Sequence, residues 1–411
     1  MSNDTQPEIR FPGFTEDWEQ RELSDISTKV QTKNKDREFT ETLTNSAEFG
    51  IISQNDFFDK EISNKNNIDG YYVVKPNDFV YNPRISNFAP VGPIKRNKLG
   101  RTGVMSPLYY VFSTNNIDNQ YLETYFSTSY WHKFMKLNGD SGARADRFAI
   151  RDSVFVKMPI PYPSREEQEK IGQFFEVLSN AIALQQRKLD LLKETKKGFL
   201  QKMFPKNGAK VPEIRFPGFT EDWEQRKLGE VVERVTRKNK KLESIRPLTI
   251  SAQEGLIDQN EFFNKTVASR DVSGYYLVKK GEFAYNKSYS NGYPWGAVKR
   301  LNQYDMGVLS TLYIVFKPKK IDSDFLEKYY DTTYWYKEVS KHAAEGARNH
   351  GLLNIAASDF FETEIVMPLK IEEQQKIGAF FKQLDDTIAL QQRKLDLLKE
   401  MKKGFLQKMF V

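Results

Sequence analysis

The stretch IALQQRKLDLLKETKKGFLQKMF at residues 182–204 returns as IALQQRKLDLLKEMKKGFLQKMF at residues 388–410. Only Thr195 and Met401 differ between the two copies. Neither copy contains proline, so each predicts an unbroken helix. Together with the residues that precede them, the copies predict helices of about 39 residues, or about 58 Å, over 166–204 and 372–411.

Apolar residues recur at heptad spacing along both predicted helices, over about four heptads. The sustained seam predicts a coiled coil, and two such helices in one chain bury their seams most economically against each other. The alternative is that each helix packs separately on its own domain. Gln185 and Gln391 fall in the seam, where polar residues fix register. The seam residues are Phe175, Leu178, Ile182, Leu189 and Leu192 in the first helix and Phe381, Leu384, Ile388, Leu395 and Leu398 in the second.

A second repeat shows that half of the protein is duplicated. The segment PEIRFPGFTEDWEQR at 7–21 returns unchanged at 212–226. We call each copy a strap and interpret it as an irregular segment whose aromatic side chains dock on an apolar surface. The duplication divides the chain into an N-terminal strap (1–21), a first domain (22–165), a first helix (166–204), a linker with the repeated strap (205–226), a second domain (227–371) and a second helix (372–411).

The two intervening domains show short strand-like runs broken by Asn, Gly and Pro. Examples are Tyr71–Val74 and Leu108–Phe112, which Tyr275–Val278 and Leu312–Phe316 match in the second half. A short helix is expected over 118–137 and over its counterpart 322–342. The pattern predicts an α+β domain with a curved, mostly antiparallel sheet in each half.

Composition bounds the class of protein. A chain of 411 residues suits two or three domains, and no apolar run is long enough to span a membrane. The polar start MSNDTQPEIR does not resemble a signal peptide. The absence of Cys excludes disulfides and thiolate metal sites, and three His are too few for a convincing metal cluster. We therefore expect a soluble, cytoplasmic protein that holds no metal, and the net charge of +7 favours a polyanionic partner.

Catalytic motifs are missing from the sequence. There is no phosphate-binding P-loop motif and no G-x-G-x-x-G after a strand. Tyr81-Asn82-Pro83-Arg84 lacks the second Pro and the aromatic residue of an amino-methyltransferase motif. The Glu-x-Lys triplets at 194–196 and 400–402 imitate half of a nuclease site, but they lie in the predicted helices at ordinary solvated positions. We expect a chain without catalysis of its own.

Residues suited to nucleic-acid binding occur at equivalent places in both halves. Basic runs follow each strap and can contact phosphates, although solvated charge runs are common. Loops after a strand carry Asn, Arg or Lys, side chains that can read guanine or adenine. Gly-Ala-Arg loops combine a small backbone with a guanidinium, a pattern also found in surface turns. The candidates are Lys33, Lys35, Asn82, Arg84, Ser141, Arg144 and Arg147 in the first half and Lys238, Lys240, Asn286, Lys287, Tyr289, Arg348, Asn349 and His350 in the second.

The two halves have diverged unevenly. Helices and straps are nearly identical, whereas loops such as 82–86 and 286–290 differ widely. One explanation is that helices and straps meet two identical partners while the loops read different targets. The other is sequence exchange between the repeats.

The layout resembles the specificity subunit of type I restriction-modification systems over essentially the whole chain. The similarity rests on the order of the parts, on the repeated strap and on the helices Glu166–Lys193 and Glu372–Lys399, which look like that family's repeated spacer. The resemblance implies two target recognition domains that each read half of an asymmetric, bipartite DNA site. It also implies an antiparallel helix pair with pseudo-two-fold symmetry that fixes the gap between the half-sites.

The resemblance further implies a non-catalytic subunit that assembles with two methyltransferase subunits and two restriction subunits in defence against foreign DNA. Those partners, not this chain, would bring S-adenosylmethionine, ATP and Mg²⁺ for adenine methylation and restriction. Two other hypotheses remain open from the sequence. One is a coiled-coil scaffold without nucleic-acid binding, and the other is a fused enzyme with its own catalysis.

Overall fold

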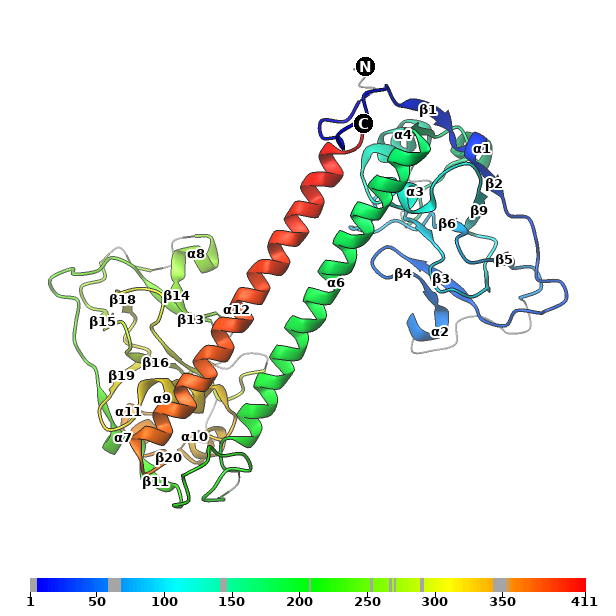
Figure 1. The fold of residues 1–411 in the computed structure, drawn as a ribbon. Helices are drawn as coiled ribbons and strands as arrows, with labels where there is room; N and C mark the ends of the chain where they lie inside the picture. The colour runs from blue at the N-terminus through cyan, green and yellow to red at the C-terminus, as the bar shows by residue number, and fades with distance from the viewer. Residues whose placement is uncertain are drawn as a thin grey trace. The chain divides into compact units, whose positions relative to one another are not determined.

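The computed structural model describes residues 6–57, 68–140, 146–206, 208–251, 254–265, 268–269, 271–288, 292–342, 353 and 355–411. The chain divides into two compact units. Unit 1 contains Met1–Gln186 together with Arg393–Val411, and unit 2 contains Arg187–Gln392 (Figure 1). Each unit therefore joins one α+β domain to parts of both long helices.

Unit 1 is built on short antiparallel strands, as the short strand-like runs predicted. One four-stranded sheet has the order β2-β9-β6-β7, and two-stranded pairs β1-β10, β3-β4 and β5-β8 surround it. The elements are β1 (Glu19–Glu22), α1 (Leu23–Ile26), β2 (Ser27–Lys29), β3 (Leu43–Ser46), β4 (Gly50–Ser53), α2 (Gln54–Phe57), β5 (Tyr72–Val74), β6 (Phe79–Tyr81), β7 (Ile94–Arg96), β8 (Gly103–Met105), β9 (Tyr110–Thr114), α3 (Asn119–Tyr125), α4 (Tyr130–Asn138), α5 (Asp152–Phe155), β10 (Pro159–Tyr162) and the start of α6 (Arg165–Lys202).

Unit 2 repeats this order, with the sheet β12-β19-β16-β17 and the pairs β11-β20, β13-β14 and β15-β18. Its elements are β11 (Glu224–Lys227), α7 (Leu228–Val231), β12 (Val232–Arg234), β13 (Leu248–Ser251), β14 (Gly255–Asp258), α8 (Gln259–Phe263), β15 (Tyr276–Lys279), β16 (Phe283–Asn286), β17 (Ala297–Arg300), β18 (Met306–Leu309), β19 (Ile314–Pro318), α9 (Ser323–Asp331), α10 (Tyr336–His342), α11 (Ala357–Phe361), β20 (Glu364–Met367) and the start of α12 (Ile371–Lys408).

The single helix expected over 118–137 is wrong, because two helices, α3 and α4, occupy that stretch. Hydroxyl groups bond to the backbone where the helix breaks. Ser127 Oγ donates to the Glu123 carbonyl at 3.0 Å and Thr128 Oγ1 donates to the Tyr125 carbonyl at 2.7 Å. Such local bonds compete with helix continuation. The same break separates α9 from α10, where Thr332 Oγ1 donates to the Tyr329 carbonyl at 2.6 Å.

Each strap docks on the core through its tryptophan, as predicted. Trp18 is 5% exposed, and its indole N–H donates to the Glu167 carboxylate at 3.2 Å. Arg10 completes the contact with two hydrogen bonds to Glu167, at 2.7 and 2.8 Å. Unit 2 repeats the arrangement with Arg215 and Trp223 on Glu373. A buried carboxylate with a bidentate guanidinium partner thus fixes each strap to the start of a long helix.

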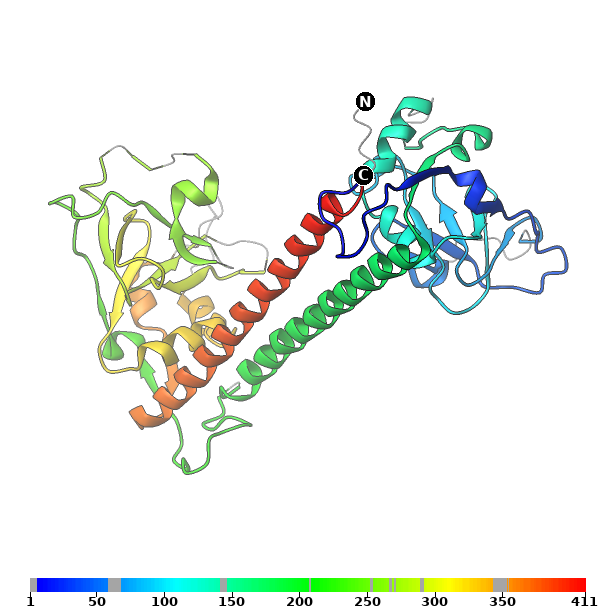
Figure 2. The ribbon, with the colours of Figure 1, turned by 45° about the horizontal axis from the view of Figure 1, so that its top comes forward.

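The long helices exchange their ends between the units. Phe410, which follows α12, lies in the core of unit 1, 5.6 Å from the ring of Tyr121 and 6.3 Å from that of Trp18. Phe204, which follows α6, lies in the core of unit 2, 5.5 Å from the ring of Phe325. Figures 1 and 2 show the C-terminal end of α12 beside the first strap, where the Ile9 amide donates to the Lys408 carbonyl at 2.8 Å. Each domain is thus completed by the helix end of the other repeat.

The two long helices contact each other in antiparallel orientation, which confirms the predicted pairing. In unit 1, Phe174 packs on Phe405 with ring centroids 5.1 Å apart, and the Lys402 ammonium donates to Ser179 Oγ at 2.9 Å. Residue numbers therefore rise along one helix as they fall along the other. In unit 2, Phe199 packs on Phe380 at the same 5.1 Å.

The predicted seam residues fall into two groups by exposure. Half of them are buried: Phe175, Leu178, Leu189, Phe381 and Leu395. The others are half-buried: Ile182, Leu192, Leu384, Ile388 and Leu398. Leu184 and Leu191, which lie outside the seam, are 66% and 68% exposed. The seam is therefore the buried side of both helices, as the heptad pattern predicted.

Candidate nucleic-acid interface

Unit 1 brings together two of the loops selected from the sequence. Arg84, after β6, and Arg147 pair as an isolated antiparallel bridge. Backbone hydrogen bonds flank the bridge, from the Ile85 amide to the Asp146 carbonyl at 3.0 Å and from the Phe148 amide to the Pro83 carbonyl at 2.8 Å. Loops about 60 residues apart in the sequence thus form a short two-stranded ribbon. We call residues 83–85 and 146–148 the arginine ribbon.

Asn82 holds this ribbon in place. Its side-chain N–H donates to the Asn45 carbonyl at 2.9 Å, and its side-chain oxygen accepts from the Arg84 amide at 3.0 Å. Behind it, a Cβ on Gly92 would lie 2.1 Å from the Asn82 carbonyl oxygen, and Gly92 has a φ of +83°. Only glycine fits this turn without strain. The base contact of Asn82 stays a prediction, and in this structure its amide group bonds the backbone of Asn45 and Arg84.

The matching ribbon of unit 2 is held in the same way. The Leu353 amide donates to the Lys287 carbonyl at 2.9 Å, and the Asn286 side-chain oxygen accepts from the Ser288 amide at 3.0 Å. A Cβ on Gly296 would also lie 2.1 Å from the Asn286 carbonyl oxygen. The Lys287 ammonium donates to the Ile355 carbonyl at 3.4 Å. Lys287 therefore corresponds to Pro83 of the arginine ribbon, and Ser288 stands at the position of Arg84.

Several predicted residues lie outside the described part of the chain, so the structure does not place them. They are Ser141, Arg144, Tyr289, Arg348, Asn349 and His350.

The lysines that follow the straps lie against tyrosine rings. The ammonium of Lys33 lies 3.3 Å from the centroid of Tyr72, and that of Lys238 lies 4.1 Å from the centroid of Tyr276. Lys238 also donates to the Gly274 carbonyl at 2.9 Å. These two cations help to hold β5 and β15, whereas Lys35 and Lys240 are exposed. Lys35 and Lys240 are therefore the two of these four lysines whose side chains extend into solvent.

A cavity of about 730 Å³ adjoins the arginine ribbon. Tyr72, Tyr109 and Tyr110 line it together with Lys29 and Arg151. Burial raises the pKa of Tyr110 to about 12, so the phenol stays neutral. Aromatic rings beside cations are the side chains that stack on bases and approach phosphates. The cavity is lined by residues that are distant in the sequence, so sequence motifs did not reveal it.

Phe88 is a further candidate that the sequence did not single out. It lies in a tight turn in which the amides and carbonyls of Ser86 and Ala89 bond to each other at 3.0 and 3.1 Å. The side chain is 82% exposed, four residues from Arg84. An exposed aromatic ring next to a cation is suited to stacking on a base. Its signal in the sequence was an aromatic residue inside a polar loop.

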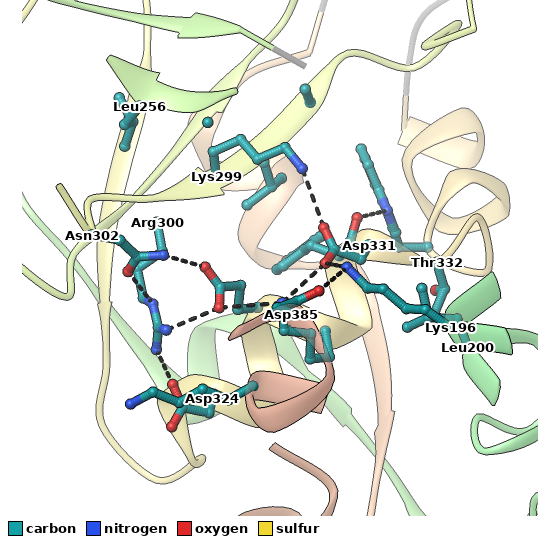
Figure 3. Close-up of a pocket in the computed structure, with 18 of the residues that line it drawn as sticks. Lys196, Leu200, Leu256, Lys299, Arg300, Asn302, Asp324, Asp331, Thr332 and Asp385 are labelled. Atoms are coloured by element: carbon teal, nitrogen blue, oxygen red, sulfur yellow. Dashed lines mark hydrogen bonds and ion pairs between the residues drawn. The ribbon is translucent and has the colours of Figure 1, made fainter. Parts of the chain in front are cut away.

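Unit 2 holds a larger cavity of about 1330 Å³ between its domain and the C-terminal part of α6. Lys193, Lys196 and Lys197 of α6 line it together with Lys299 and Arg300 of β17. Figure 3 labels Lys196, Lys299 and Arg300 in this cavity. Asp324, Asp331 and Asp385 also line the cavity and pair with several of these cations. The surface therefore combines positive charge with internal ion pairs.

Neither a metal cluster nor a membrane span stands out in the structure. Across the described ranges, His, Asp and Glu side chains form no group of three or more that could hold a metal ion. None of the helices in the described part of the chain combines the length and apolar character that a membrane crossing needs.

Comparison with known proteins shows which family this architecture matches. The sequence matches the family described as the type I restriction modification DNA specificity domain over residues 15–194 and again over 220–400. The specificity subunit of the type I restriction enzyme MjaVIII from Methanocaldococcus jannaschii is 25% identical over 333 residues, which cover 75% of this chain and 73% of that protein.

Two solved structures share the fold across nearly the whole chain. The S subunit of a type I restriction-modification system from M. genitalium has a TM-score of 0.58 at 13% identity, covering 99% of each chain. A chain from a study of complex assembly and conformational transition of the type I R-M system has a TM-score of 0.51 at 15% identity, covering 98% of this chain and 99% of that one. At these identities the likeness shows the fold alone.

Proposed function

Because this chain belongs to the family of type I restriction-modification DNA specificity subunits, we propose that its two domains read the two halves of one asymmetric DNA site. The family match covers each repeat separately. The repeats present different side chains at equivalent ribbons, because Arg84 of unit 1 corresponds to Ser288 of unit 2 and Pro83 corresponds to Lys287. A guanidinium bonds a guanine edge through two nitrogens, whereas an ammonium acts as a point donor. Two unlike ribbons on one frame are the observation that supports an asymmetric site.

The specificity subunits of this family are non-catalytic. Under the proposal, adenine methylation and restriction are carried out by two methyltransferase and two restriction subunits that bind this chain. Those partners would supply S-adenosylmethionine, ATP and Mg²⁺. The exposed leucines Leu184, Leu191, Leu390 and Leu397, outside the seam of α6 and α12, are available for contacts with such partners.

The first experiment maps methylated adenines in DNA from a host that expresses the full chain with its methyltransferase partner. We expect a two-part, asymmetric sequence with an unread gap. A host that lacks only this chain serves as the control and should show no such methylation. Modification restricted to one continuous palindrome would refute the proposal.

We also propose that the paired helices set the length of the gap. A matched insertion of seven residues in α6 and in α12 keeps the heptad register and lengthens each helix by about 10 Å. Such an insertion should change the gap by about three base pairs while leaving both half-sites unchanged. A four-residue insertion, which breaks the heptad register, is the control and should destabilise the helix pair instead. An unaltered gap in the seven-residue variant would contradict a role for the helices in spacing.

A further inference from the structure

Unit 2 contains a nearly buried lysine that is neutralised by carboxylates. The side chain of Lys328 in α9 is 7% exposed, and its ammonium lies 2.7 Å from Asp385 and 3.3 Å from Asp331. Lys196 of α6 reaches Asp385 at 2.6 Å, and Lys299 of β17 reaches Asp331 at 3.2 Å (Figure 3). The three ammonium groups thus share two aspartates, one from α9 and one from α12.

The carboxylates keep this cluster charged. Burial lowers the pKa of Lys328, but the charges of Asp331, Glu327 and Asp385 outweigh it and raise the pKa above its ordinary value. Burial likewise opposes the charge on Asp331, and Lys299, Lys328 and Lys196 together lower its pKa. Each charge in this part of unit 2 therefore has an opposite charge within reach.

The equivalent place in unit 1 keeps two of the lysines and loses the aspartates. Lys95 of β7 corresponds to Lys299, and Lys402 of α12 corresponds to Lys196. Ser127, Ser179 and Thr124 stand where unit 2 has Asp331, Asp385 and Lys328. Lys402 donates to Ser179 Oγ at 2.9 Å, a neutral partner in place of a carboxylate. Among the described residues, the structure shows no ion pair for the ammonium of Lys95.

Glu123, a carboxylate of this region in unit 1, already has two cationic partners. Glu123 pairs with Arg96 at 2.6 Å and with Lys98 at 3.5 Å. Burial lowers the pKa of Lys95 although the charge of Glu123 opposes it. Burial, Lys95 and Lys98 lower the pKa of Lys402, again against Glu123. Lys98 is half-exposed, so the cluster reaches solvent. Unit 1 thus has cations gathered around a position that carries too little negative charge.

We propose that unit 1 binds a phosphate-type oxyanion between Lys95 and Lys402, in the place where unit 2 has its two aspartates. A phosphate monoanion or dianion supplies the negative charge that Ser127 and Ser179 lack, and its oxygens accept from both ammonium groups. The anion is either free phosphate or a phosphate of the DNA backbone. This site goes beyond the reading of bases, and its first test uses no DNA.

The experiment titrates inorganic phosphate into the full chain by calorimetry at constant ionic strength, with chloride as the reference anion. Ser179→Asp introduces the carboxylate found at Asp385 and should weaken phosphate binding at least tenfold. Lys402→Gln removes one ligand and should weaken it similarly. The matched control is the triple exchange Lys328→Thr, Asp331→Ser and Asp385→Ser, which gives unit 2 the residues of unit 1 and should add a second phosphate site.

A second arm distinguishes the source of the phosphate. The slope of log affinity for duplex DNA against log salt is measured for the wild type, Ser179→Asp and Lys402→Gln, after thermal unfolding has shown that each variant folds. Phosphate binding that these substitutions abolish supports a free anion. No phosphate binding, together with a slope reduced by about one in both variants, supports a backbone phosphate.

Two outcomes overturn the proposal. One is phosphate binding of equal strength in the wild type and in both variants, which would place the anion elsewhere. The other is an absence of phosphate binding with an unchanged salt slope. If the chain does not bind DNA, phosphate binding that both substitutions weaken supports the site, and an absence of phosphate binding overturns it. Failure of this site and failure of the proposed function are therefore separate results.

Discussion

Units 1 and 2 share one frame but neutralise their charges differently. In both, a strap arginine and tryptophan bond a buried glutamate, and a phenylalanine from the end of a long helix fills the core. Behind the sheet, unit 2 pairs its lysines with Asp331 and Asp385, whereas unit 1 has Ser127 and Ser179 there. The strap contacts and the aromatic packing of the helix ends recur in both units, whereas the partners of the lysines have diverged.

This comparison gives a physical reason for the near-identity of the helices and straps. The end of α6 packs in the core of the second domain, and the end of α12 packs in the core of the first. A substitution in one helix end therefore has to fit the domain of the other repeat. Packing of this kind restricts both copies to the same residues, in addition to any restriction from identical partners or sequence exchange.

The largest expected effect tests the shared frame. Phe204→Ala removes a ring that is 1% exposed, and Phe410→Ala removes one that is 3% exposed. Each substitution should lower the free energy of unfolding by about 3–5 kcal/mol. Limited proteolysis should show opening of unit 2 in the first variant and of unit 1 in the second. Leu191→Ala, at a position 68% exposed, is the control and should stay near wild type. If Phe410→Ala opens unit 2 instead, the exchange of helix ends is wrong.

A second, smaller loss of stability should differ between the two units. Asp331→Ala removes a carboxylate partner of Lys328 and Lys299 and should lower the free energy of unfolding by about 2–4 kcal/mol. This loss is smaller than for a fully buried ion pair, because Asp331 is 19% exposed. The matched Ser127→Ala in unit 1 should change stability by less than about 0.5 kcal/mol, since its side chain is exposed. Both values come from denaturant unfolding at low salt. Equal costs in the two units would contradict the difference between them.

A third pair of substitutions should act with opposite signs. Asp78 is 7% exposed, and burial raises its pKa to about 6 from an ordinary value of 3.8. The folded chain therefore holds a proton that the unfolded chain loses, and stability falls as pH rises from about 4 to 6. Asp78→Asn removes this loss and should stabilise the protein by about 1 kcal/mol at pH 7.

The equivalent residue of unit 2 has a different environment. Glu282 accepts two hydrogen bonds from Arg237, at 3.0 and 2.8 Å. Glu282→Gln should therefore destabilise the protein by about 1–2 kcal/mol at pH 7. Thermal unfolding between pH 4 and 7 measures both variants. If Asp78→Asn and Glu282→Gln change the stability at pH 7 in the same direction, the charge partners of the two residues do not explain their difference.

Much of the frame could be predicted from the sequence because its signals are local or periodic. The heptad pattern identified the helices and their buried side, and the aromatic residues of the strap predicted docking by Trp18. The hydroxyl-backbone bonds of Ser127 and Thr128, which divide α3 from α4, depend on rotamers that periodicity does not reveal. The exchange of helix ends was also missed, because a helix pattern does not specify which core receives its last residues.

The candidate interface was predicted less completely for a related reason. Residue types selected Arg84 and Arg147 separately, but their pairing depends on a contact between distant loops. The same criterion selected Asn82 for base contact, although its side chain bonds the backbone beneath Arg84. Side-chain chemistry thus indicated the region, and only the tertiary structure separates the groups that face solvent from those that support them.

The most direct test of the account compares Arg84→Ala with Lys287→Ala in the host methylation assay. Arg84→Ala should relax the sequence preference in one half-site only, by about 1–3 kcal/mol if the guanidinium bonds a guanine through two nitrogens, and Arg84→Lys should not restore it. Lys287→Ala should affect the other half-site only. Relaxation of both half-sites by either substitution, or no change in either, would contradict the claim that each unit reads its own half of the DNA site.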